Sequence, residues 1–232
     1  RDILRVKFLV GLFDEPYQTD LEGADKEVEK KENLEVALQS SKESLVLLKN
    51  ERNTLPLDIS SIKKIAVCGP NADESGYALT HYGPLAVDVV TVLQGIKDKV
   101  KGKAEVLYAK GCELVDDNWP ESELIDYPLT ETEKDEIDKA VADVKQADVA
   151  VVVLGGGQRT CGENKSRSSL DLPGRQLDLL KAVYATGKPV VLVLINGRPL
   201  SINWADKFVP AILEAWYPGS MGGIAVADAL FG

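Results

Sequence analysis

The sequence predicts an α/β protein, a three-layer α/β/α sandwich built around a mostly parallel sheet of five or six strands. Apolar runs such as Val149–Leu154 and Val190–Ile195 contain no polar residue, and they alternate along the chain with amphipathic stretches. Strands that are apolar on both faces are typical of parallel sheets covered by helices on each side. These runs are far shorter than the roughly 20 residues that span a membrane, so we expect them to be buried strands.

Residues 34–232 contain the elements of this sandwich in alternating order. Leu34–Asn50 is amphipathic and predicts a helix, with Asn33 as its N-cap. Thr130 and Glu133 have the spacing of a capping box, which marks the start of a later helix. The other predicted elements are the strands Ile62–Gly69, Ala104–Ala109, Asp148–Leu154, Pro189–Asn196 and Val209–Trp216, and the helices Val90–Val100, Thr130–Gln146, Pro173–Ala185 and Ser220–Leu230.

The residues before this domain predict two further segments. Residues 1–13 place apolar side chains near helical spacing and predict a helix that Pro16 ends. Residues 19–33 carry many charges of both signs and few apolar groups, which is typical of a linker or a surface helix. The chain begins without Met or a signal peptide and ends without a polar tail, so we expect it to be a fragment of a longer polypeptide.

The composition argues against several classes of function. The chain has 232 residues, with 27 Lys and Arg against 37 Asp and Glu, so its formal net charge is −10 at pH 7. An acidic surface repels polyanions, which argues against nucleic acid as a partner, and no apolar run is long enough for a membrane span. Three separated cysteines and a single histidine, His81, argue against a structural zinc site and a disulfide scaffold.

Ligands bind open parallel sheets outside the carboxyl ends of the strands, so the loops after the strands form the candidate site. Three of these loops are long, and long loops in a compact domain are usually functional or disordered; they are 69–89, 110–129 and 155–172. The third begins with three glycines. Glu163 and Asn164 nevertheless stand where a P-loop has its Lys and its Ser or Thr, which argues against nucleotide binding.

Glu163 is the candidate catalytic residue of this third loop. It follows a glycine, and Arg159 and Arg167 lie nearby as candidate substrate-binding residues. A loop carboxyl serves as a general acid when burial raises its pKa toward neutrality. The spacing alone fits a solvated glutamate paired with a cation better, because surface ion pairs are common. The ring of Tyr82, in the loop 69–89, can stack on the apolar face of a sugar or simply cover the loop.

Four stretches together resemble glycoside hydrolase family 3, the family of β-glucosidases, β-xylosidases and related β-glycosidases. ILRVKFLVGLFDEPY resembles the last helix of that family's catalytic (β/α)8 barrel, and ESLVLLKNERNTLPL resembles the entry to its second domain. IKKIAVCGPNAD, followed by VVTVLQGIK, resembles the first strand, loop and helix of that domain. The remainder of the domain is matched by GENKSRSSLDLPGRQLDLLKAV, GKPVVLVLINGRPL and AILEAWYPGSMGGIAVADALFG.

The resemblance implies a division of the chain. Residues 1–18 are the last helix of a barrel that is otherwise missing, and residues 19–33 are a charged linker. Residues 34–232 are the sandwich domain, truncated at its C-terminal end. The implied partners are the missing barrel domain and a β-linked oligosaccharide or glycoside, with no cofactor, no metal, no nucleic acid and no membrane. The family's substrates favour a periplasmic or secreted protein, and a homo-oligomer remains open.

The resemblance also implies a reaction, the hydrolysis of terminal non-reducing β-D-glycosyl residues by a retaining mechanism of the β-glucosidase type. The position of the family's acid/base glutamate matches Glu163, while the nucleophilic aspartate lies on the barrel, outside this chain. Retaining enzymes place two carboxyl groups about 5–5.5 Å apart, so we expect the chain alone to be inactive. Tyr82 matches the loop whose aromatic residue often lines the +1 subsite. The alternatives are a β-xylosidase and a non-catalytic sugar-binding or structural module.

Overall fold

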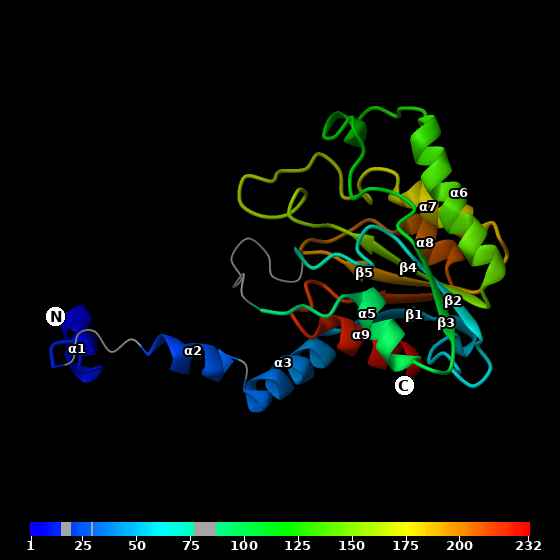
Figure 1. Cartoon of the computed structure of the whole chain (residues 1–232). Helices are drawn as coiled ribbons and strands as arrows, with labels where there is room; N and C mark the ends of the chain where they lie inside the picture. The colour runs from blue at the N-terminus through cyan, green and yellow to red at the C-terminus, as the bar shows by residue number, and fades with distance from the viewer. Residues whose placement is uncertain (15–19, 29, 77–86) are drawn as a thin grey trace. The chain divides into compact units, whose positions relative to one another are not determined.

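The computed structural model describes residues 1–14, 20–28, 30–76 and 87–232 (Figure 1). The chain divides into two compact units, Arg1–Val36 and Ala37–Gly232. The first contains the helices α1 (Asp2–Leu9) and α2 (Leu21–Val28), and α3 (Lys31–Ser44) begins in the first unit and ends in the second. Part of the predicted charged linker is therefore helical. All residues of α1 are exposed, its apolar side chains included.

A six-stranded sheet forms the centre of the second unit, which confirms the predicted fold class. The strands are β1 (Val46–Asn50), β2 (Lys64–Cys68), β3 (Glu105–Ala109), β4 (Val149–Gly155), β5 (Val190–Ile195) and β6 (Ala211–Glu214), and their order in the sheet is β1-β6-β5-β4-β2-β3. β2 to β6 are mutually parallel, and β1 pairs antiparallel with β6. Five parallel strands thus end at the same edge of the sheet.

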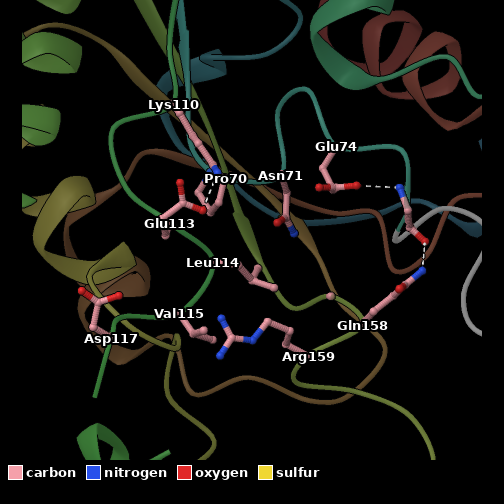
Figure 2. A pocket seen from close by; sticks show the side chains of 12 residues that line it. Pro70, Asn71, Glu74, Lys110, Glu113, Leu114, Val115, Asp117, Gln158 and Arg159 are labelled. Atoms are coloured by element: carbon pink, nitrogen blue, oxygen red, sulfur yellow. Dashed lines mark hydrogen bonds and ion pairs between the residues drawn. The ribbon is translucent and has the colours of Figure 1, made fainter. Parts of the chain in front are cut away.

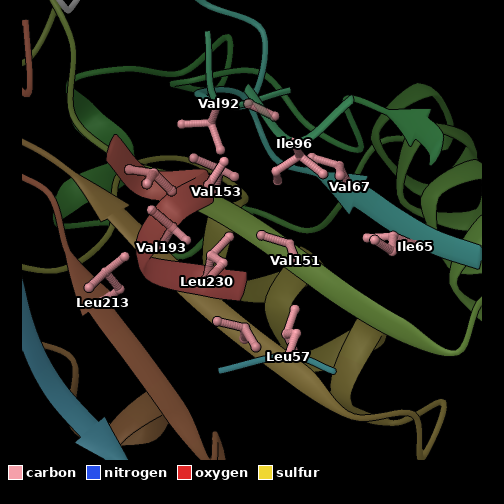
Figure 3. Packing of buried hydrophobic residues seen from close by; sticks show 14 of the residues in the cluster. Leu57, Ile65, Val67, Val92, Ile96, Val151, Val153, Val193, Leu213 and Leu230 are labelled. Atoms are coloured by element: carbon pink, nitrogen blue, oxygen red, sulfur yellow. The ribbon is translucent and has the colours of Figure 1, made fainter. Parts of the chain in front are cut away.

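Helices cover both faces of this sheet (Figure 1). α5 (Val92–Lys99) and α9 (Gly222–Phe231) pack against one face; α6 (Glu131–Gln146), α7 (Gln176–Tyr184) and α8 (Asn203–Phe208) pack against the other. Side chains alternate between the two layers because successive residues of a strand point to opposite faces. Val151 and Val153 of β4 contact the α5–α9 layer (Figure 3), while Val152 and Leu154 contact the α6–α7 layer.

The prediction of one helix over Leu34–Asn50 is wrong after Ser44. The helix α3 begins at Lys31, not after Asn33, and ends at Ser44. The apolar residues that follow form β1, in which Val46 pairs with Glu214 and Asn50 with Ala211. The open edge of β6 offers backbone hydrogen-bond partners, and a run of four apolar residues without helical periodicity fits a strand better than an amphipathic helix.

Other boundaries differ from the predicted ones by a few residues. The helix predicted from Pro173 begins at Gln176, since Gly174 has a φ of +57°, outside the helical region. The strand predicted over Val209–Trp216 is the four-residue β6, and the short α8 before it was not predicted. Two short 3-10 helices, Glu51–Asn53 and Glu121–Glu123, complete the elements of the described chain.

The predicted capping box at the start of α6 is confirmed. The Thr130 hydroxyl accepts a hydrogen bond from the Glu133 backbone N–H at 3.2 Å, and the Glu133 carboxylate accepts one from the Thr130 backbone N–H at 2.8 Å. Among the helices that the structure describes, none has the length and apolar character that crossing a lipid bilayer requires.

Candidate functional site

The neighbouring strands β2 and β4 mark the point where the chain switches faces. After β2 the chain runs to α5 on one face of the sheet, and after β4 it runs to α7 on the other. Because the two connections diverge, a crevice opens between them at the carboxyl edge, where open α/β sheets bind their ligands.

Glycines at the ends of these two strands allow the backbones to approach closely. Gly69 has a φ of +110°, and a Cβ atom there would lie 2.0 Å from the carbonyl oxygen of Val153. Gly155 has a φ of +138°, and a Cβ atom there would lie 1.9 Å from the carbonyl oxygen of Ile195. A positive φ and the lack of space for a Cβ atom both require glycine at these two positions. Packing, rather than phosphate binding, therefore explains Gly155, the first glycine of the glycine-rich segment.

A pocket of about 320 Å³ occupies the crevice (Figure 2). The loops after β2, β3 and β4 all contribute to its wall, and Leu114 and Val115 give it an apolar side. Its charged and polar residues are Asn71, Glu74, Lys110, Glu113, Asp117, Gln158 and Arg159. A small apolar surface surrounded by hydrogen-bonding groups of both charges suits a neutral polar ligand with several hydroxyl groups.

Two buried amide side chains hold the loops around this pocket. Asn71 is 1% exposed, and its Nδ2 donates to the carbonyl oxygens of Gly156 at 2.9 Å and Ile195 at 3.1 Å. Gln176 is fully buried; its Oε1 accepts from the Gly155 N–H at 2.7 Å, and its Nε2 donates to the carbonyl oxygens of Gly155 and Leu114, both at 2.9 Å. These bonds join the ends of β2, β4 and β5 to the loop after β3.

Gln176 was missed in the sequence, although a signal was present. It lies on the same helical stripe as Leu179, Leu180 and Val183, all of which are fully buried. A polar residue on an otherwise apolar stripe must have buried hydrogen-bond partners.

The predicted catalytic residue Glu163 lies in an exposed turn of the loop after β4. The Lys165 N–H donates to the carbonyl oxygen of Gly162 at 3.2 Å and closes the turn. Gly162 and Asn164 have φ values of +132° and +60°, so the residues on both sides of Glu163 adopt backbone conformations that few residue types favour. The turn places Glu163 at the same edge of the sheet as the pocket.

Arg167, predicted to bind substrate, has protein partners in the structure. Its Nε lies 2.5 Å from Oε1 of Glu123, on the loop after β3, and both side chains are only 3% exposed. The other carboxylate oxygen of Glu123 accepts a hydrogen bond from the Ser168 N–H at 2.6 Å. Arg167 Nη2 donates to the carbonyl oxygen of Asp171 at 2.7 Å, and the guanidinium lies 5.4 Å from the centre of the Trp119 ring. The sequence could not reveal Glu123 as the partner, because 44 residues separate the two.

A second buried arginine fixes the far end of the loop after β3. Arg175 is 8% exposed, and its Nε lies 2.9 Å from the carboxylate of Glu133 at the start of α6. Its Nη1 and Nη2 donate to the carbonyl oxygens of Tyr127 and Pro128 at 2.9 and 3.2 Å. The loop is thus joined to the rest of the domain by two arginine–glutamate pairs.

Residues in the loops after β5 and β6 also bind the segment around Glu163. Arg198 Nη2 donates to the carbonyl oxygen of Lys165 at 2.7 Å. The Tyr217 and Cys161 side chains are hydrogen-bonded, and burial together with that thiol raises the pKa of Tyr217. Gly197 packs against both, since a Cβ atom on it would lie 2.5 Å from the Tyr217 ring.

Glu214, at the carboxyl end of β6, is a buried acid that was not among the predicted site residues. It is 6% exposed; Oε1 accepts from the Trp216 N–H at 2.9 Å, and Oε2 accepts from Asn196 Nδ2 at 3.2 Å. Burial raises its pKa to about 7. A single charge inside the apolar run Ala211–Trp216 was the signal for it.

The remaining predicted site residues divide into two groups. Arg159 is exposed and lines the pocket. Tyr82 lies outside the described residues. Within the part of the chain that the structure describes, no three His, Cys, Asp or Glu side chains gather as metal ligands would. Burial raises the pKa of the Cys68 thiol to about 12, which makes it a poor nucleophile.

Comparison with known proteins places this arrangement in a family. Residues 45–232 match the glycosyl hydrolase family 3 C-terminal domain. The chain is 41% identical to a β-xylosidase of Formosa agariphila, covering 99% of this chain and 30% of the relative, and 40% identical to the periplasmic β-glucosidase of Salmonella typhimurium, covering 100% and 32%. A solved β-glucosidase of Erythrobacter marinus superposes with a TM-score of 0.81 at 35% identity, over 99% of this chain and 32% of that one.

The chain therefore spans about a third of the length of the curated relatives it matches. The family match covers the whole sheet, both helical layers and all the loops described above. This chain belongs to glycosyl hydrolase family 3 and contains the C-terminal α/β domain of that family.

Proposed function

We propose that this chain supplies the acid/base residue, Glu163, of a retaining β-glycosidase. The observation that carries the proposal is the position of Glu163, an exposed residue on a turn at the carboxyl edge of the sheet, beside the loops that form the pocket. The resemblance of Gly162–Leu172 to the family's acid/base loop supports the same role. A barrel domain outside residues 1–232 supplies the nucleophilic aspartate, and the chain alone hydrolyses no glycoside.

The proposed reaction has two steps. In the first, the barrel aspartate attacks the anomeric carbon while Glu163 gives its proton to the departing glycosidic oxygen, which leaves a covalent glycosyl–aspartate. In the second, Glu163 removes a proton from water, and the resulting nucleophile releases the sugar with retained configuration. We assign two features to binding of the sugar or its leaving group: the pocket that Arg159 lines, and Tyr82.

The substrate is a β-glucoside in our first proposal and a β-xyloside in the second. The Salmonella and Erythrobacter relatives are named β-glucosidases, and the relative at 41% identity is named a β-xylosidase. A xyloside differs from a glucoside by the absence of the hydroxymethyl group at C5, so the two are separated by comparing kcat/KM on matched p-nitrophenyl glycosides.

Glu163→Gln in the two-domain enzyme tests the role of Glu163, because glutamine has no proton to give. We expect kcat/KM on phenyl glycosides, whose leaving group needs protonation, to fall by about 10²–10⁴-fold. On 2,4-dinitrophenyl glycosides kcat/KM should change little, but kcat should fall, because the attack of water on the glycosyl–aspartate has lost its general base. Azide should restore turnover of the dinitrophenyl substrate and yield the β-glycosyl azide, because azide attacks the glycosyl–aspartate without a base.

Glu121→Gln is the matched control, since Glu121 is an exposed glutamate on the neighbouring loop after β3. It should behave as the parent enzyme on all substrates. If Glu163→Gln also behaves as the parent, Glu163 is a solvated carboxylate, and the domain is a structural or sugar-binding module.

A further inference from the structure

Side chains from three separate loops fix the short segment that carries Glu163. We propose that Arg167, through its pair with Glu123, and Arg198 are positioning residues that hold the turn Gly162–Lys165 so that Glu163 reaches the glycosidic oxygen in one place. This inference rests on the proposed acid/base role of Glu163.

The first set of bonds that holds the turn lies just after Glu163 in the chain, at Arg167 and Ser168. Glu123 receives both Arg167 Nε and the Ser168 N–H, at 2.5 and 2.6 Å, so one carboxylate holds a side chain and the adjacent backbone. The Arg167 and Glu123 side chains are each only 3% exposed, so water has little access to their ion pair. Ionic hydrogen bonds in such a site are strong and directional, and residues 167–168 therefore keep their position relative to the loop after β3.

The second set of bonds holds the turn itself, at Lys165, and the residue just before it, Cys161. Arg198, from the loop after β5, donates to the carbonyl oxygen of Lys165, two residues after Glu163. Cys161, two residues before it, is hydrogen-bonded to Tyr217 from the loop after β6. Arg198 Nε is buried without a hydrogen-bond partner among the described residues, so Arg198 forgoes one hydrogen bond in the position from which it holds Lys165.

A proton donor needs such fixing more than a binding residue does. Proton transfer requires a heavy-atom distance of about 2.6–3.2 Å in the reacting complex, and a misplacement of about 1 Å costs on the order of 10²-fold in rate. The Glu163 side chain is exposed and is flanked by two residues with positive φ. The backbone of the turn sets the position of the Glu163 Cα atom, from which the side chain extends.

Arg167 is also the residue that the sequence predicts to bind substrate, and the two roles differ in a measurable way. A positioning residue acts on proton transfer, so its loss slows substrates with poor leaving groups and spares those with good ones. A substrate contact acts on every glycoside that carries the same sugar, so its loss lowers kcat/KM by one factor whatever the leaving group.

The experiment measures kcat/KM of the two-domain enzyme on phenyl and 2,4-dinitrophenyl glycosides of the same sugar. For Arg167→Met and for Glu123→Gln we expect a loss of about 10–100-fold on the phenyl glycoside and less than about 3-fold on the dinitrophenyl glycoside. Arg167→Lys keeps the charge and should recover part of the loss. Arg198→Met should act in the same direction, with a smaller effect.

Arg175→Met is the matched control, because Arg175 is a buried arginine paired with a glutamate and bonded to the same loop as Glu123, but away from the turn of Glu163. It should lower the melting temperature as Arg167→Met does and leave the ratio of the two kcat/KM values unchanged. On the isolated chain, hydrogen exchange of the amides of residues 161–168 should accelerate in Arg167→Met and stay unchanged in Arg175→Met.

The outcomes separate this inference from the proposed function. One outcome is that the loss of kcat/KM in Glu163→Gln depends on the leaving group, whereas the losses in Arg167→Met, Glu123→Gln and Arg198→Met do not. The positioning role is then wrong, and the acid/base role of Glu163 stands. If Arg167→Met fails to fold, Glu123→Gln and Arg198→Met decide the question alone. If Glu163→Gln shows no such dependence, the proposed function and this inference fall together.

Discussion

The interior of the sheet and the loops at its carboxyl edge are held together by different interactions. All seven residues of β4 and all six of β5 are buried, and their contacts are almost entirely apolar. The loops are joined instead by a few buried polar groups: Asn71, Gln176 and the pair Arg167–Glu123. Apolar contact is not directional, whereas a hydrogen bond fixes distance and angle. The apolar interior thus stabilises the fold, and the polar bonds at the edge fix the positions of the loops.

The largest effect is expected from a cavity in the interior. Leu192 of β5 is fully buried against the α6–α7 layer, so Leu192→Ala removes apolar contacts that the surrounding strands cannot replace. We expect the free energy of unfolding to fall by about 3–5 kcal/mol. Urea unfolding measures it, and hydrogen exchange should rise across the whole sheet, because the cost applies to global unfolding.

Leu124→Ala is the control for this substitution, since Leu124 is 76% exposed. It should change the free energy of unfolding by less than about 0.5 kcal/mol. A loss at Leu192 no larger than that at Leu124 would contradict the view that the interior carries the stability.

A smaller but more local effect is expected at the edge. Gln176→Ala leaves the Gly155 N–H and the carbonyl oxygens of Gly155 and Leu114 without their buried partner. We expect a loss of about 2–3 kcal/mol, because buried unsatisfied polar groups keep their full desolvation cost. Exchange should rise first in the loops after β3 and β4, under conditions in which the amides of β5 remain protected.

Gln146→Ala provides the comparison, as Gln146 is an exposed glutamine near the end of α6 whose amide bonds only within that helix. It should be close to neutral. If Gln176→Ala raised exchange uniformly through the sheet, the loops and the interior would be one cooperative unit, and the contrast between them would not hold.

The sequence predicted the interior much better than the edge. Apolar runs and helical periodicity are local signals, and they identified β4, β5 and the capping box of α6 at nearly their observed positions. β1 was missed because its partner β6 lies about 160 residues later, and because its short apolar run directly follows the amphipathic residues of α3.

The candidate site shows the same limit. Glu163 was identified by family resemblance, because its spacing alone fits a solvated loop glutamate. The pair Arg167–Glu123 joins two loops without periodicity, so neither residue carries a sequence signal of its partner. Gln176 and Glu214 did carry one, each being a polar residue inside an apolar pattern.

The last expected effect is pH-dependent and concerns Glu214, an ionisable group placed where the interior meets the edge. Its pKa is about 7 in the folded chain because of burial, against about 4.3 for a solvated glutamate. The folded state therefore binds the proton more tightly than the unfolded state. The stabilising contribution of protonated Glu214 is complete below about pH 4.3 and is lost as the pH rises to 7.

Glu214→Gln isolates this contribution, because glutamine stays neutral and its carbonyl oxygen can still accept from the Trp216 N–H. We expect the variant and the parent to be similar in stability near pH 4.5. By pH 7.5 the variant should be more stable by a few degrees in melting temperature, and Asp206→Asn, an exposed carboxylate on α8, should show no such trend. A difference independent of pH would mean that Glu214 is already ionised at pH 4.5 in the folded chain, and that its bonds to Trp216 and Asn196 outweigh the cost of burying the charge.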